Sequence, residues 1–93
     1  MLKTRSAQYY QVKKGQTLDE VAEYFSVSAF LLAKINGLED EPFTGQILEI
    51  PEEKGDAYTV REGDTKALLC GGEENYFRKN GTDVFYIGMR VIL

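Results

Sequence analysis

The chain has 93 residues, a formal net charge of −4, 43% hydrophobic residues and 28% charged residues, a globular composition that fits one domain or two very small ones. Nucleic-acid binding needs clustered cations, and no run of Lys or Arg is longer than Lys13-Lys14, so we expect no nucleic-acid partner. No apolar run approaches the roughly 20 residues that cross a bilayer, so we expect no membrane partner.

The amino-terminal segment, Met1 to Gln8, is polar and basic and lacks the apolar stretch of a secretory signal. We therefore expect a cytoplasmic protein if Met1 is the natural start. If the chain is a piece of an exported protein, we expect it at the cell wall.

The next residues predict a strand followed by a helix. Residues alternate from Tyr10 to Lys13, which places Tyr10 and Val12 on one face of a short half-buried strand. Thr17 is a suitable N-cap, and Glu20 three residues later completes the sequence pattern of a capping box. The helix has one apolar stripe at positions i, i+3, i+4 and i+7, formed by Leu18, Val21, Ala22 and Phe25.

A second helix and a second strand follow. Ser28 is placed to cap the helix, and Asn36-Gly37 ends it because both residues tolerate a left-handed turn. Gly45 precedes the strand, in which Leu48 and Ile50 are expected to face the core. The inner face of the helix is expected to consist of Ala29, Leu32 and Ile35.

The second half of the chain repeats these landmarks. The pattern Tyr-x-Val-[Lys/Arg]-x-Gly-x-Thr begins at Tyr10 and again at Tyr58, and Asn36-Gly37 recurs as Asn80-Gly81. In each copy the two strands are expected to be antiparallel neighbours, because both helices must cover the same sheet face. The repeat predicts a first unit at residues 9–51, a polar linker at residues 52–57 and a second unit at residues 58–93.

The second unit departs from the first in its middle. Gly71-Gly72 is expected to end its first helix early, because a glycine pair is costly inside a helix. A second helix is expected from about Glu73 to Lys79. The unit lies below the roughly 40 residues that usually fold unaided, so we expect it to depend on a partner.

Several apolar residues occupy positions that would be exposed in an isolated unit, and clustered exposed apolar area usually marks a contact surface. These residues are Phe30, Leu31, Ile47 and Ile92. We therefore expect the two units to pack together, or two chains to form a homodimer or another protein to bind through this surface.

The residues needed for most catalytic sites are absent. The sequence contains no His, and Cys70, its only cysteine, has no imidazole to activate it. No phosphate-binding glycine motif occurs, although a carboxylate pair for acid–base chemistry stays possible among the 15 Asp and Glu residues. We therefore expect a protein that is not an enzyme, has no catalytic residues and holds no metal or cofactor.

The order of these features resembles the LysM domain family. The first copy, Tyr10 to Pro51, matches the family pattern nearly end to end, including Val27-Ser28, Asn36 and Gly45-Gln46. The second copy, Tyr58 to Leu93, matches at both ends and poorly in the middle, so it resembles a degenerate repeat. The resemblance implies an α+β fold of two tandem β-α-α-β units, each a two-stranded antiparallel sheet covered by two short helices.

The resemblance also implies a function. LysM modules bind polymers containing N-acetylglucosamine, such as peptidoglycan or chitin, in a shallow groove between the loop after the first strand and the loop after the second helix. In the first copy these loops contain Gly15, Gln16, Thr17, Leu18, Asn36, Gly37, Leu38 and Glu39. The matching residues of the second copy are Gly63, Asp64, Thr65, Asn80 and Gly81. Alternatively, these residues serve only the fold, as turn glycines, helix caps and helix stops.

Two features bear on the choice of ligand. Gln16 stands where the family usually has Asp, which removes a charge but keeps a hydrogen-bond acceptor. Glu39-Asp40-Glu41 places three carboxylates in the second loop of the groove, which should repel the free carboxylates of peptidoglycan at low salt. A neutral chitin-like chain would be repelled less.

A second function stays open, an intracellular protein-interaction or scaffold module of the spore-coat type that keeps the LysM fold without binding sugar. The acidic loop, the lone Cys70 and the extra apolar surface favour this function, whereas the groove loops favour sugar binding. Four aromatic residues are expected in the core or at an interface, with stacking on sugar rings as the alternative, namely Tyr76, Phe77, Phe85 and Tyr86.

Overall fold

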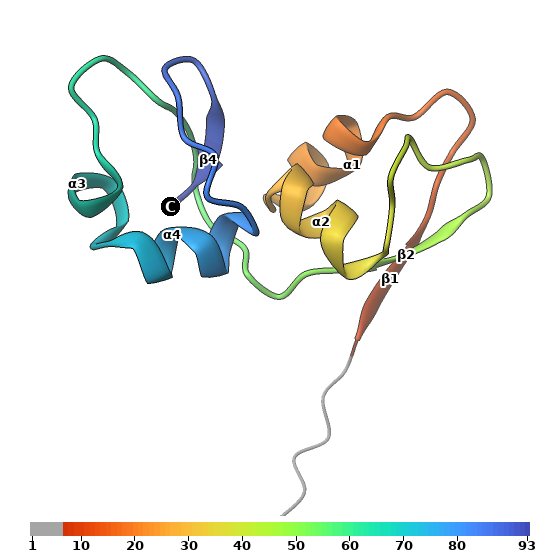
Figure 1. The fold of residues 1–93 in the computed structure, drawn as a ribbon. Coiled ribbons are helices and arrows are strands. Elements are labelled where there is room, and N and C mark those ends of the chain that lie inside the picture. Colours follow the sequence, from red (N-terminus) through yellow and green to blue (C-terminus); the bar gives the residue numbers. More distant parts are fainter. Residues whose placement is uncertain (1–6) are drawn as a thin grey trace, which may run out of the picture.

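The computed structural model describes residues 7–93, which form two successive β-α-α-β units (Figure 1). The first unit contains β1 (Gln8–Gln11), α1 (Leu18–Phe25), α2 (Ala29–Ile35) and β2 (Ile47–Ile50). The second unit contains β3 (Ala57–Thr59), α3 (Lys66–Cys70), α4 (Glu73–Asn80) and β4 (Arg90–Ile92). Each unit pairs its own two strands as an antiparallel sheet, so the predicted α+β fold is confirmed.

The prediction about Met1 to Gln8 falls mainly on residues 1–6, which lie outside the described residues. Residues 52–57 connect the units, and the last of them, Ala57, already pairs with Ile92 in the second sheet. Within residues 7–93, no helix is long and apolar enough to cross a membrane.

The core of the first unit lies between its sheet and its two helices. β1 pairs with β2, and strand alternation buries Val12, Leu48 and Ile50 as predicted. At the start of α1, the Thr17 hydroxyl accepts the Glu20 N–H, and the Glu20 carboxylate accepts the Thr17 N–H. The predicted capping box is therefore confirmed, and it fixes how the first loop enters the helix.

The end of α2 differs from the prediction at one residue. Ile35 is 42% exposed, so its assignment to the inner face is wrong, and Leu38 packs against the core instead. The chain turns back at Gly37, which has a φ of 62°. Leu38 N–H donates to the Ala33 carbonyl at 2.9 Å, and Gly37 N–H donates to the Lys34 carbonyl at 3.3 Å. This is the hydrogen-bond pattern of a Schellman motif, which returns an apolar residue to the helix.

The second unit has a smaller core around Tyr76. The Tyr76 side chain is fully buried and packs in one cluster with Val60, Met89 and Val91. Burial raises the pKa of the Tyr76 hydroxyl to about 12. The helix α3 ends at Gly71, whose φ of 87° is left-handed, as the glycine pair predicted.

The two units pack together through α2 and α4 (Figure 1). Ser28 donates its hydroxyl to the carbonyl oxygen of Asn80 at 2.7 Å, in a buried hydrogen bond. Arg90 donates a guanidinium N–H to the carbonyl oxygen of Val27 at 3.0 Å. Ser28 and Val27 both lie in the short turn between α1 and α2, so this turn holds the first unit to the second through both hydrogen bonds.

The residues predicted to form a contact surface have different environments. Leu31 lies against Gly81 of the second unit, and Ile92 is fully buried beside Gly55 of the connecting segment. Phe30 is 46% exposed and Ile47 is 56% exposed. Ile47 does not join the contact between the units, because it lies on the face of β2 opposite the buried strand residues.

We predict that Gly81→Ala weakens the contact between the units. The φ of 67° at Gly81 disfavours any side chain, and an added Cβ would lie 2.7 Å from the Leu31 Cα. The matched control is Gly63→Ala, since Gly63 has a φ of 89° but nothing within 4 Å of the added Cβ. Urea denaturation should show a loss of about 1–2 kcal/mol for the control and a larger loss for Gly81→Ala. Equal losses would show that the close approach does not matter.

Candidate functional site

The loop between β1 and α1 is held by the side chain of Gln16. Its Oε1 atom accepts the Tyr10 hydroxyl at 2.8 Å and the Lys13 N–H at 3.1 Å. Gly15, in the same turn, has a φ of 76° and is exposed. The side-chain oxygen of Gln16 therefore serves the turn, while the backbone of Gly15 faces solvent.

The second unit contains the same arrangement with an aspartate. Asp64 Oδ2 accepts the Tyr58 hydroxyl at 2.7 Å and the Arg61 N–H at 2.7 Å. The hydrogen bond from Tyr58, followed by that from the Arg61 backbone, lowers the pKa of the Asp64 carboxyl. The same bond raises the pKa of the Tyr58 hydroxyl. Because Gln16 and Asp64 accept equivalent bonds, the turn requires an acceptor at this position and not a charge.

The asparagines that end the second helix of each unit also have equivalent roles. Asn36 donates both Nδ2 hydrogens, to the carbonyl oxygens of Leu32 and Glu49, and its Oδ1 accepts the Glu49 N–H, all at 2.8 Å. We call this set of three bonds the asparagine bridge. It joins the end of α2 to the backbone of β2, so both hydrogens and the oxygen of the Asn36 amide are bonded within the fold.

Asn80 forms the asparagine bridge of the second unit. It donates to the carbonyl oxygens of Tyr76 and Ile92 at 3.2 and 3.1 Å, and it accepts the Ile92 N–H at 2.8 Å. Asn80 is 1% exposed, and Gly81 lies against Leu31 of the first unit. Asn80 is therefore not accessible to a ligand, and Gly81 is half-buried at the contact between the units, so the second unit's counterpart of the predicted groove is largely closed.

The structure brings the two predicted groove loops of the first unit together. Glu41 Oε1 accepts the Leu18 N–H at 2.6 Å, which ties the acidic loop to the amino terminus of α1. A carboxylate is favourable there because the first N–H groups of a helix lack partners within the helix. Leu18 and Leu38 are half-buried at the base of the loops, whereas Gly37 and Glu39 are exposed.

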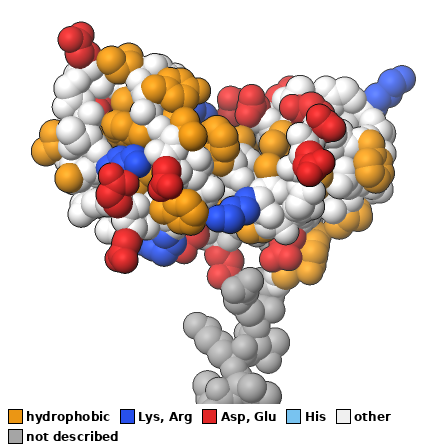
Figure 2. Space-filling view, viewed as in Figure 1, with side chains coloured by type: hydrophobic (Ala, Val, Ile, Leu, Met, Phe, Trp, Pro, Cys, Tyr) orange, Lys and Arg blue, Asp and Glu red, His pale blue; other side chains and the backbone are white. Residues whose placement is uncertain are grey.

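Acidic side chains gather over α1 and the loop after α2 (Figure 2). They include Asp19, Glu20 and Glu23 on α1 and Glu39, Asp40 and Glu41 on the loop. The sequence predicted the acidic loop, but it did not predict that the Glu41 carboxylate accepts a hydrogen bond from a backbone N–H. That contact joins residues 23 positions apart, so no local pattern could indicate it.

A cleft of about 440 Å³ lies in the second unit beside Asp64 and Thr65, two of its predicted residues. Its other walls include Lys66, Glu73 and Phe85. The repeated sequence pattern did not predict these three as ligand-binding residues. Lys66 donates to the Glu73 carboxylate at 2.8 Å and to the Asp83 carbonyl at 2.9 Å. Among these residues, only Phe85 had a sequence feature that pointed to a site, since an aromatic ring can stack on a sugar.

Residues 10–51 match the family model of the LysM domain. The first unit is a LysM domain. Domains of this family are binding domains and not catalytic ones, and their typical ligands are glycans that contain N-acetylglucosamine, such as peptidoglycan. The matched residues contain both groove loops, the capping box and the asparagine bridge of the first unit.

Two solved structures are similar to the chain. The spore cortex-lytic enzyme SleL of Bacillus cereus is 20% identical, with a TM-score of 0.46 over 95% of this chain and 23% of that chain. SleL of Bacillus megaterium QM B1551 is 28% identical, with a TM-score of 0.47 over 94% of this chain and 22% of that chain. The chain thus spans less than a quarter of the length of these enzymes. A search of curated proteins found no match.

We predict that Asn36→Ala destabilises the LysM domain by about 1–3 kcal/mol, because the β2 backbone at Glu49 and the end of α2 lose their partners. Asn75→Ala is the control, since the side chain of Asn75 is exposed, donates to the Cys70 carbonyl and accepts only a long bond of 3.4 Å from Arg78. Thermal unfolding of both variants measures the difference. A loss no larger than that of the control would show that the asparagine bridge contributes little.

We predict that acid weakens the second unit through Asp64. The pKa of its carboxyl is lowered on folding, so its stabilising effect is complete above the ordinary value of about 3.9 and is lost as the pH falls through the lowered folded value. Asp64→Asn keeps an acceptor, as Gln16 does in the first unit, and removes the titration. The stability difference between wild type and variant, measured by thermal unfolding, should shrink between pH 6 and pH 2. A constant difference would contradict this role.

Proposed function

We propose that the chain is a non-catalytic module that binds polymers containing N-acetylglucosamine, of the peptidoglycan or chitin type. The observation that supports this proposal is the LysM match over residues 10–51. In the same proposal, residues 9–51 are the principal binding unit, residues 52–57 connect it, and residues 58–93 are a reduced LysM-type repeat.

The proposed site is the groove between the two loops of the first unit. Gly15 and Gly37 are exposed there and offer backbone groups suited to the amide of an N-acetyl group. Thr17 lies between the loops, but its N–H and carbonyl are bonded to Glu20 and Val21, so it supports the groove through the start of α1. Leu18 and Leu38 provide an apolar base for the acetyl methyl group. Gln16 and Asn36 are proposed only to hold the two loops in place, since their side chains are hydrogen-bonded within the fold. Glu39 lies at the exposed edge of this groove.

The charge of the groove favours a neutral sugar chain. Glu39 and Asp40 are exposed, and the Glu41 carboxylate already accepts a hydrogen bond from the Leu18 N–H. A ligand with free carboxylates would meet like charges at this edge, and salt would weaken the repulsion. We therefore expect a chitin-type oligomer to bind more tightly than an acidic peptidoglycan fragment at low ionic strength.

The second unit supports a smaller role in the same function. Its cleft presents the aromatic Phe85 beside Thr65 and the charged pair Lys66 and Glu73. Asp64 lines this cleft but is bonded to Tyr58, and Gly63 lies exposed before it. We propose this cleft as the place where the second unit contacts sugar, in preference to the buried Asn80 and the half-buried Gly81.

Protein binding is the second candidate function. Tyr9 is 61% exposed and Ile47 is 56% exposed, and both lie on the outer face of the first sheet. Adjacent exposed apolar residues on one face often mark a contact surface. Of the residues predicted for a homodimer, Leu31 and Ile92 are already covered within the chain, so a partner would use Phe30 or Ile47.

Titration with a tetramer of N-acetylglucosamine tests the proposed site. The backbone NMR signals of Gly15 to Leu18 and of Gly37 to Glu39 should shift together, because both loops line one groove. Binding should be weak, since a shallow groove covers little of each sugar. Shifts restricted to other parts of the chain would place the sugar outside the proposed groove, and no shifts at millimolar ligand would favour the protein-binding alternative.

A charge variant tests the expected preference for neutral ligands. The double substitution Glu39→Gln and Asp40→Asn should strengthen binding of a muropeptide with free carboxylates at low salt and leave the neutral tetramer unchanged. Glu74→Gln, on the exposed side of α4, is the control for net charge. Equal gains in the double variant and the control would assign the effect to overall charge and not to the groove.

A further inference from the structure

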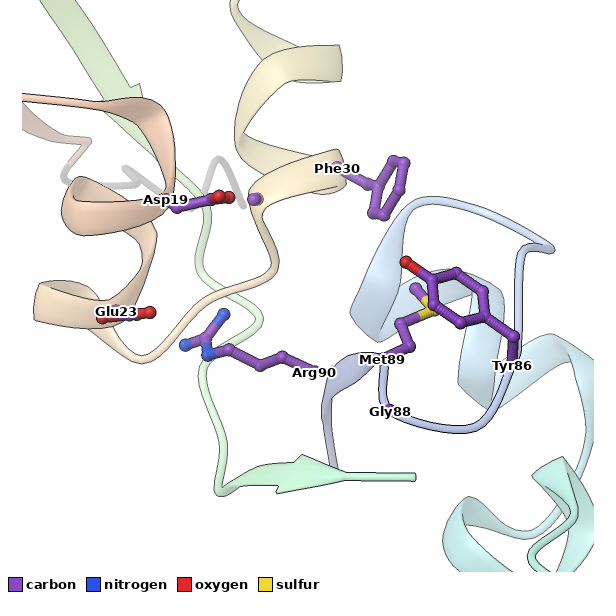
Figure 3. Close-up of a pocket in the computed structure, with 8 residues that line it drawn as sticks. Asp19, Glu23, Phe30, Tyr86, Gly88, Met89 and Arg90 are labelled. Carbon is purple, nitrogen blue, oxygen red and sulfur yellow. The ribbon is translucent and has the colours of Figure 1, made fainter. Parts of the chain in front are cut away.

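A cleft of about 240 Å³ lies between the two units, apart from the groove described above. One side is formed by α1 and the start of α2, and the other by the loop that leads into β4 (Figure 3). Because the Ser28 bond to Asn80 and the Arg90 bond to Val27 fix the units relative to each other, the two sides are held at a set separation.

Two aromatic side chains border the cleft. Phe30 projects from the start of α2, and Tyr86 projects from the opposite loop with its hydroxyl directed toward Phe30 (Figure 3). Phe30 is 46% exposed and Tyr86 is 57% exposed, and within residues 7–93 neither ring packs against another ring. Exposed ring faces on opposite sides of a cleft can pack against the C–H face of a pyranose ring, which excludes water from both.

Polar groups complete the cleft. Asp19 and Glu23 extend their carboxylates from α1, and in the described part of the chain neither makes an ion pair or a side-chain hydrogen bond. Arg90 extends from β4 toward α1, and its bond to Val27 leaves other guanidinium hydrogens available (Figure 3). The cleft thus offers acceptors and donors for sugar hydroxyls, with two negative charges against one positive charge.

A shallower hollow connects this cleft to the proposed groove. It is lined by Leu18 and Ala33 and shares Asp19, Ala29 and Phe30 with the cleft. Leu18 also lies at the base of the groove. A continuous surface therefore leads from the groove, past Phe30, to Tyr86.

We propose that the cleft between the units is a second sugar subsite, which binds a neutral hexopyranose of the same polymer that occupies the groove. This inference rests on the proposed function, and it adds a role for the second unit. Phe30 and Tyr86 pack against the sugar ring, while Asp19, Glu23 and Arg90 bind its hydroxyls. The excess negative charge excludes sugars that carry a carboxylate.

The test compares sugar length and aromatic variants. A hexamer of N-acetylglucosamine should reach both sites, so Tyr86→Ala and Phe30→Ala should each weaken its binding, measured by calorimetry, by roughly three- to tenfold. Tyr9→Ala, which removes an equally exposed aromatic ring from the outer sheet face, should have no effect. Equal melting temperatures of the three variants show that each is folded, and wild-type NMR shifts at Gly88 and Met89 on hexamer addition provide a readout that needs no variant.

Each outcome separates the two proposals. Shifts in the groove loops without shifts at Gly88 and Met89, and with unchanged hexamer affinity in both cleft variants, would overturn the subsite and leave the proposed function. Shifts at Gly88 and Met89 alone would support the subsite and overturn the groove. No binding of the hexamer anywhere would overturn the proposed function, and the subsite with it.

Discussion

Each unit depends on an asparagine bridge between the end of its second helix and the backbone of its second strand. The strands are three or four residues long, and a two-stranded sheet of that length is marginal by itself in water. Asn36 and Asn80 supply hydrogen bonds that tie the last strand to the helix above it. In the second unit the backbone carbonyl oxygen of Asn80 also accepts the Ser28 hydroxyl. One residue therefore closes the small core and attaches it to the first unit.

This constraint separates the residues that define the motif from those that can contact a ligand. The side-chain oxygens of Gln16 and Asp64 accept hydrogen bonds within the turn, and those of Asn36 and Asn80 accept hydrogen bonds within the bridge. Residues with a repeated sequence position therefore build the fold. In the proposed function, recognition falls to exposed backbone in the loops and to residues that do not repeat, such as Tyr86, since these are not needed to close either core.

Sequence patterns predicted what depends on neighbouring residues. Thr17 with Glu20 predicted a capping box, and the glycine at position 71 predicted a short helix, because caps and left-handed turns are set within a few residues. Ile35 was assigned to the inner face by helical spacing, but the turn at Gly37 brings Leu38 there instead. The cleft between the units could not be predicted, because it depends on the contact of Ser28 with Asn80, 52 residues away.

The fixed contact between the units determines how two weak sites would act together. A flexible linker would leave the second site at a range of distances, and ordering it on binding would oppose the gain. Here Gly81 lies against Leu31, and two hydrogen bonds hold the turn between α1 and α2 to the second unit. Under the proposed function, a sugar chain long enough to reach from the groove to the cleft would meet both sites already aligned, so the second contact would add to the first with little further ordering. A shallow groove in a small domain can in this way distinguish a polymer from its short fragments.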